Sequence, residues 1–244
     1  MYHRPPIVDP MNASPLAPSA RRFAPTALAG LAASALLALP LVSTADPPGV
    51  DPNAKWPNGT IVHFGDSFVD SGLSQTLRPK FTEQHTRYVA LGKFNTMLGQ
   101  WANSGDISSY HYAYRPSLFI VTLGASEVNA NPPEIRRSAV QQINKHMNGV
   151  PCVWISVPLW KGAPSGLTEM IRRESAPCRH FDSSMVADKI TRQSDHVHPD
   201  AKGGAIWGEA FWAWLQANRD PSKSGWALKP APADEHGPAR PGGT

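Results

Sequence analysis

A serine-containing turn follows directly on an apolar run near residue 60. The mostly apolar residues 61–64 (IVHF) lead into Gly65-Asp66-Ser67-Phe68-Val69-Asp70-Ser71-Gly72. This order is typical of a buried strand that ends in a glycine-started turn and exposes a hydroxyl, which can act as a nucleophile if a base lies within hydrogen-bond reach. Gly-Asp-Ser is also a common turn in which Asp66 or Ser67 caps a helix, so the tripeptide alone does not decide between these readings.

The base that such a serine needs is present far downstream, in Asp195-His196-Val197-His198-Pro199-Asp200. A histidine can take the serine proton, and an aspartate on its other ring nitrogen fixes the tautomer and stabilises the imidazolium. Asp195 and His198 are three residues apart, so one turn of backbone can present both side chains on the same side. The two segments together indicate a serine hydrolase.

These motifs resemble those of the SGNH or GDSL hydrolases, a family of esterases, lipases and deacetylases. The resemblance rests on Gly65-Asp66-Ser67 as the first block and Asp195-x-x-His198-Pro199 as the last, and it spans roughly residues 60 to 217. It implies that Ser67 is the nucleophile, His198 the base and Asp195 the residue that orients the base. The family needs no cofactor or metal for this chemistry, and we expect none here.

The oxyanion hole that the family implies matches less well. The family has Gly-x-Asn-Asp after a buried strand, whereas this chain has Gly124-Ala125-Ser126-Glu127. Ser126 thus stands where an asparagine amide would donate, and Asn129 is a further donor in reach along the chain. The backbone N–H of Ser67 is the second expected donor. Counting back from residues 124–127 places the third expected donor at the amide of Asn95, with Gly105 as the reserve candidate.

The rest of the chain alternates between strand-like and helix-like segments. Buried strands are predicted at residues 60–64, 87–91, 118–123 and 150–157, with a short fifth strand at 180–182. Helical spacing of apolar residues is clearest at 133–147 and 201–217. The alternation predicts a three-layer α/β/α, flavodoxin-like domain at residues 60–218 with a parallel sheet of about five strands, in which sites form at the carboxyl ends of strands.

The ends of the chain have different compositions from the domain. Arg21 and Arg22 precede an uncharged Ala- and Leu-rich run up to Val42 and the small residues 43–45, an order that predicts a secretory signal at 1–45 with cleavage after Ala45. A retained membrane anchor is the alternative. Residues 46–59 are a Pro-rich lead-in, and residues 219–244 are predicted to be a disordered tail. We therefore expect a secreted or periplasmic protein.

Charge and cysteines fit this compartment. Removing residues 1–45 takes away three arginines and one aspartate, which lowers the net charge from +4 to +2, and no basic cluster points to nucleic acid. Cys152 and Cys178 are an even pair in an exported chain, which favours a disulfide over two buried thiols. In the sheet order that the resemblance implies, the two cysteines lie on neighbouring strands, which makes the pairing geometrically reasonable.

The expected substrate is an ester with a short acyl group, carried by a small molecule or a glycan. Trp160 follows a predicted strand, where its indole could stack on a sugar ring or close the core. His196, His198 and their neighbouring aspartates have a spacing seen in metal sites, but no second cluster matches them, so we expect no metal. A monomer is expected. Two alternatives stay open: an inactive glycan-binding relative, and an O-acyltransferase on the same scaffold.

Overall fold

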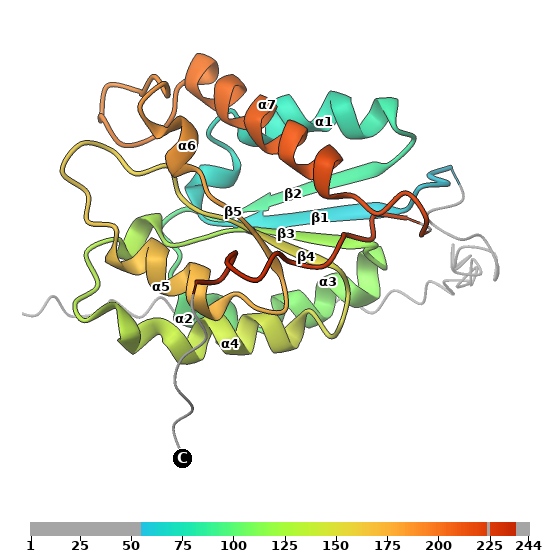
Figure 1. The fold of residues 1–244 in the computed structure, drawn as a ribbon, viewed down its shortest axis with the longest axis horizontal. Coiled ribbons are helices and arrows are strands. Elements are labelled where there is room, and N and C mark those ends of the chain that lie inside the picture. The colour runs from blue at the N-terminus through green and yellow to red at the C-terminus, as the bar shows by residue number, and fades with distance from the viewer. Residues whose placement is uncertain (1–54, 224, 238–244) are drawn as a thin grey trace, which may run out of the picture. The chain divides into compact units, whose positions relative to one another are not determined.

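A five-stranded parallel sheet forms the centre of the protein (Figure 1). The computed structural model describes residues 55–223 and 225–237. The strands are β1 (Thr60–Gly65), β2 (Arg87–Gly92), β3 (Leu118–Thr122), β4 (Cys152–Ile155) and β5 (Arg179–Phe181), in the order β2-β1-β3-β4-β5. This order confirms the predicted flavodoxin-like sheet. The chain adds strands on one side of β1 first and then on the other, so the topological switch point lies between β1 and β3. The predicted signal at 1–45 lies outside the described residues.

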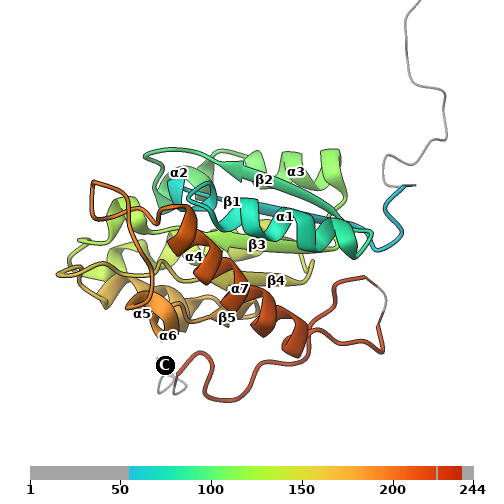
Figure 2. The ribbon, with the colours of Figure 1, turned by 90° about the horizontal axis from the view of Figure 1, so that it is seen from above.

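Helices cover both faces of the sheet (Figures 1 and 2). One face is covered by α1 (Leu73–Glu83) and α7 (Ala201–Asn218), and the short α6 (Ser184–Ala187) contacts α7. The other face is covered by α2 (Leu98–Asn103), α3 (Asp106–Tyr114), α4 (Arg137–His146) and α5 (Gly166–Glu174). Single 3₁₀ turns lie at η1 (Ser67–Val69), η2 (Ala125–Glu127) and η3 (Pro133–Arg136). The three-layer α/β/α architecture is therefore as predicted.

Alternation along the strands divides the core into two halves. On β1, Val62 and Phe64 pack with the helices α2 to α5, whereas Ile61 packs with α1 and α7. Successive side chains of a strand point to opposite faces, so a central parallel strand must be apolar on both. His63 of β1 is polar but fully buried, and it is hydrogen-bonded to the hydroxyls of Tyr88 at 2.6 Å and Thr122 at 2.9 Å. Burial lowers the pKa of His63 to about 3, so this ring is neutral.

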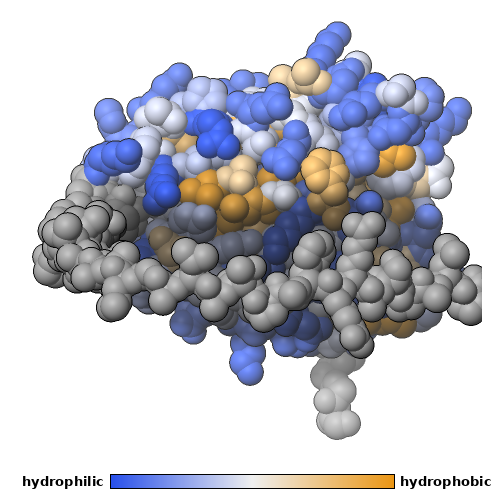
Figure 3. Space-filling model, turned by 180° about the vertical axis from the view of Figure 1, so that it is seen from behind, coloured by the Kyte–Doolittle hydropathy of each residue, from blue (hydrophilic) through white to orange (hydrophobic). Residues whose placement is uncertain are grey.

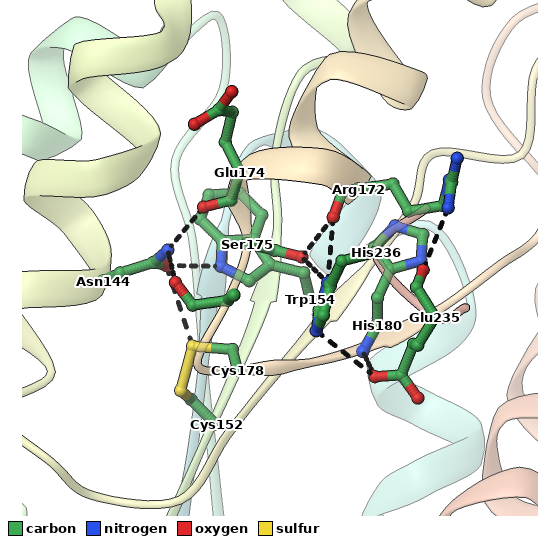
Figure 4. Close-up of a disulfide and its surroundings, with 11 residues drawn as sticks. Asn144, Cys152, Trp154, Arg172, Glu174, Ser175, Cys178, His180, Glu235 and His236 are labelled. Atoms are coloured by element: carbon green, nitrogen blue, oxygen red, sulfur yellow. Dashed lines mark hydrogen bonds and ion pairs between the residues drawn. A yellow bond between two sulfur atoms is a disulfide. The ribbon is translucent and has the colours of Figure 1, made fainter. Parts of the chain in front are cut away.

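The predicted disulfide is present. Cys152 at the start of β4 is bonded to Cys178 just before β5, and Asn144 of α4 lies beside the bridge (Figure 4). The two strands are hydrogen-bonded neighbours, which places the two cysteines side by side. A bridge across a separation of 26 residues stabilises the fold by roughly 3 kcal/mol, chiefly by restricting the unfolded chain.

The C-terminal segment differs from the disordered tail expected from residue 219. Residues 225–237 run back over the domain, and Trp226 is fully buried against Phe81, with its indole N–H donating to the hydroxyl of Thr86 at 3.0 Å. Farther along, Glu235 forms a buried ion pair with Arg179 of β5, at 2.7 Å. The low apolar content of the segment did not reveal that its tryptophan packs on α1 and that one of its carboxylates pairs with β5.

The surface is mainly hydrophilic, with hydrophobic residues in smaller groups, as the view from behind shows (Figure 3). The large apolar side chains that remain most exposed are those of Phe94, Met97, Tyr112, Ile135 and Met185. Within the described part of the chain, none of the helices has both the length and the apolar character needed to cross a bilayer.

Removing the carboxylate of Glu235 tests the role of the C-terminal segment. Glu235→Ala leaves the guanidinium of Arg179, which is 5% exposed, without its charged partner, and we expect the free energy of unfolding to fall by about 3 kcal/mol. The control is Glu209→Ala, because the Glu209 side chain is 60% exposed in its ion pair with Lys80 and its loss costs less than about 1 kcal/mol. Urea denaturation measures both, and equal small losses would contradict the account.

Candidate active site

The turn after β1 presents Ser67 at the carboxyl end of the sheet. Gly65 ends β1 where β3 passes closely: a Cβ on Gly65 would lie 1.8 Å from the carbonyl oxygen of Thr122, so no other residue fits without moving the sheet. The next residue, Asp66, caps the 3₁₀ turn η1 by accepting from the N–H of Phe68 at 3.0 Å. Ser67 is thus the first residue of η1, and N–H groups of a first helical turn have no partner within the helix.

The structure brings Ser67, His198 and Asp195 together. The Ser67 hydroxyl is 2.7 Å from Nε2 of His198, and Nδ1 of the same ring is 2.6 Å from Oδ2 of Asp195. The other carboxylate oxygen of Asp195 accepts from the N–H groups of Val197 and His198. These hydrogen bonds, that of the His198 ring above all, lower the pKa of Asp195 to about 2, so the carboxylate is ionised throughout the neutral range. The serine, the imidazole and the carboxylate therefore form one continuous relay.

Backbone contacts hold the histidine loop, residues 195–200, against the turn that carries Ser67. Asp200 caps α7 by accepting from the N–H of Gly203 at 2.7 Å, and its pKa is lowered mainly by that bond. The first turn of α7 then meets the turn after Ser67, because a Cβ on Gly204 would lie 2.5 Å from the Cα of Gly72. The two backbones touch only because both positions are glycine. This contact places the start of α7 directly against the turn that follows Ser67.

Arg192 ties the histidine loop to the loop that follows β4. Its guanidinium donates to the carbonyl of Val197, and also to those of Pro158 and Leu159, each at 2.9 Å. Val197 lies between Asp195 and His198, so one side chain holds both the histidine loop and the neighbouring wall of the site. Arg192 is not recognisable from the sequence, because its three partners are carbonyl groups, which leave no pattern in a sequence.

Asp66 links the turn that carries Ser67 to the segment that follows β3. Its Oδ2 accepts from the N–H groups of Gly124 and Ala125, both at 3.0 Å, while Oδ1 holds Phe68. No cation pairs with this carboxylate in the described residues. Burial raises the pKa of Asp66 to about 6 despite the three N–H donors, which by themselves lower it.

Of the expected oxyanion donors, Ser67 and Ser126 lie at the ends of adjacent strands. Ser126 is exposed in the 3₁₀ turn η2, directly after the two N–H groups that Asp66 holds.

Asn95 is exposed three residues beyond the end of β2, and its role stays a prediction. Gly92 lies against the turn that carries Ser67, since a Cβ there would meet the Asp66 carbonyl at 3.3 Å. The reserve candidate Gly105 begins α3, and a Cβ there would meet no atom within 4 Å.

Aromatic rings form one side of the site. Phe68 packs its ring 5.0 Å from the His198 ring and 6.3 Å from the indole of Trp160, in a stacked arrangement. Trp160 is therefore partly buried against the residue next to Ser67 while part of it stays accessible. His196 has an exposed side chain and a left-handed backbone (φ 60°) and takes no part in the relay. In the described ranges, no group of three metal-ligating His, Cys, Asp or Glu side chains is found.

No family model matches the sequence, and no curated protein matches it significantly. Solved structures do match it. TesA has a TM-score of 0.54 at 14% identity, over 65% of this chain and 98% of that one. An α/β hydrolase, LAE5, from the metagenome of Lake Arreo, Spain, has a TM-score of 0.51 at 15% identity, over 64% and 94%. The acetyl xylan esterase AlAXEase has a TM-score of 0.51 at 11% identity, over 64% and 99%.

At these identities the likeness shows a shared fold. The chain has the three-layer fold of the SGNH hydrolases, as its two motifs predict.

The pH dependence of stability tests the environment of Asp66. Because its pKa is about 6 when folded and near 3.8 when unfolded, the folded state binds more protons between these values, so the free energy of unfolding falls as the pH rises from 4 to 6. Relative to Asp66→Asn, which cannot titrate, the wild type should lose roughly 3 kcal/mol over this window.

Urea denaturation of both proteins at pH 4, 5 and 7 measures this difference. If the free energy of unfolding changed with pH in the same way in both proteins, the Asp66 carboxylate would not be buried away from water as the account requires.

Proposed function

We propose that the protein is a serine esterase. The observation that supports this most directly is the relay from Ser67 through His198 to Asp195, at 2.7 and 2.6 Å, at the carboxyl ends of a parallel sheet. In the proposed reaction the Ser67 oxygen attacks the ester carbonyl while Nε2 of His198 takes its proton. His198 then gives this proton to the leaving alcohol as the bond from carbon to the alcohol oxygen breaks. The products of this step are the free alcohol and an acyl group on Ser67.

Water completes the cycle. His198 takes a proton from a water molecule, which attacks the acyl carbon, and the proton returns to Ser67 as the acid leaves. Asp195 stabilises the imidazolium that forms in each half of the reaction. The negative charge on the carbonyl oxygen needs donors in each tetrahedral intermediate, and we assign this task to the Ser67 N–H and the Ser126 hydroxyl. Asn95 remains a further candidate.

Two features support an exported enzyme that acts on a short or sugar-linked ester. A disulfide is typical of oxidising compartments, which agrees with the secretory signal proposed at residues 1–45. Trp160 is partly accessible and stacks on Phe68, the residue next to Ser67, where an acyl group or a sugar ring would pass.

Turnover of p-nitrophenyl esters from acetate to long acyl chains tests the proposal. The purified protein should hydrolyse the short esters, and Ser67→Ala should lose at least a thousandfold in rate. An added acceptor alcohol distinguishes hydrolysis from transfer, because a transferase would release ester in place of free acid. Equal traces of activity in both folded proteins would contradict the proposal and favour a glycan-binding protein on an enzyme scaffold.

Ser126 provides a second, graded test. A hydroxyl is shorter than an asparagine amide and rotates freely, so Ser126→Asn should raise kcat, by about tenfold or more, since one good donor is worth roughly 10²- to 10³-fold. Ser126→Ala is the matched control and should lower kcat. An unchanged or lower rate in Ser126→Asn would mean that other groups build the oxyanion hole.

A further inference from the structure

The buried carboxylate of Glu127 joins the segments that follow β2 and β3. Glu127 lies in the 3₁₀ turn η2, directly after Ser126, and its side chain is only 3% exposed. Its Oε2 accepts from the N–H of Leu98, the first residue of α2, at 2.6 Å. Its Oε1 pairs with Nε of Arg136, the last residue of η3. One side chain of the turn after β3 is therefore bonded to two other segments of the chain.

The loop at residues 93–97, between β2 and α2, is held at both of its ends. At its start the N–H of Lys93 donates to the carbonyl of Gly65, two residues before Ser67, at 2.9 Å. At its other end the carboxylate of Glu127 accepts from the first N–H of α2. The loop is thus fixed to the turn that carries Ser67 on one side and to η2 on the other.

These two attachments matter because an oxyanion hole acts through donors that are already in place when charge develops in the transition state. The expected donors come from three separate segments, η1, η2 and the loop at residues 93–97, through Ser67, Ser126 and Asn95. Asp66 ties the first segment to the N–H groups just before the second. Glu127 is the side chain that ties the third segment to the second.

We propose that Glu127 is a positioning residue of the oxyanion hole. It sets the place of the loop at residues 93–97 relative to Ser67 and Ser126, and it acts through the N–H of Leu98. This role rests on the proposed esterase function. A carboxylate suits the task because its two oxygens accept from two donors at once, whereas a neutral amide offers one oxygen and turns its N–H groups toward the other donor.

Hydrolysis of p-nitrophenyl acetate by Glu127→Ala tests the role. Oxyanion donors stabilise the transition state more than the bound ester, so kcat should fall by about tenfold or more while KM stays within about twofold. An ion pair that only stabilised the fold would leave kcat of the folded enzyme unchanged. Glu134→Ala is the matched control and should keep both values, because Glu134 lies in η3 and its side chain is 41% exposed in an ion pair with Arg173.

Glu127→Gln decides the question if Glu127→Ala does not fold. It keeps the shape of the side chain but satisfies only one of the two donors, so kcat should fall by about threefold or more. Phenylboronic acid supplies a second measurement, because it forms a tetrahedral adduct with a nucleophilic serine and so resembles the transition state. Its inhibition constant should rise by the same factor as kcat falls, an effect that loss of stability alone does not produce.

The outcomes separate this role from the esterase itself. A kcat within about twofold of the wild type in a folded Glu127 variant, or a rise in KM alone, would overturn the positioning role and leave the esterase standing. Absence of hydrolysis by the wild type and by Glu134→Ala would overturn the esterase and the positioning role together.

Discussion

The carboxylate of Asp66 is the constraint on which the site depends. It lies between the turn that carries Ser67 and the end of β3 that carries Ser126, and it holds one N–H of the first and two of the second. An ionised carboxylate accepts these three hydrogen bonds better than a neutral side chain would. The charge is nevertheless buried without a cation, and burial raises the pKa of Asp66 to about 6. The protein therefore accepts an electrostatic cost in order to fix two loops at the switch point of the sheet.

A second constraint brings the histidine loop to this junction. The glycines at 72 and 204 let the backbone of α7 touch the turn after the serine, and Arg192 joins the same loop to the wall after β4. Each of these contacts is made by backbone atoms on at least one side. The geometry of the relay from Ser67 through His198 to Asp195 is consequently set by how the chain packs around the strand ends.

The fold and the relay were predictable because their signals are local in sequence. The strands are apolar on both faces, and the two short motifs stand at the ends of one domain in the order expected. The expectation of a disordered tail was wrong for residues 225–237 in the structure, because Trp226 and Glu235 are held by partners that lie far away in the sequence, among them Phe81, Thr86 and Arg179, which composition does not reveal. Arg192 was missed for a related reason: its partners come together only once the loop after β4 and the loop at residues 195–200 lie side by side.

The central claim is that Ser67 is a nucleophile activated by His198. Reaction with diethyl p-nitrophenyl phosphate, followed by fragmentation mass spectrometry, tests it without any assumption about the natural substrate. The account predicts one diethylphosphoryl group per chain, located on Ser67, and no labelling in His198→Ala. Labelling at another residue, or none in a folded wild-type protein, would contradict the account.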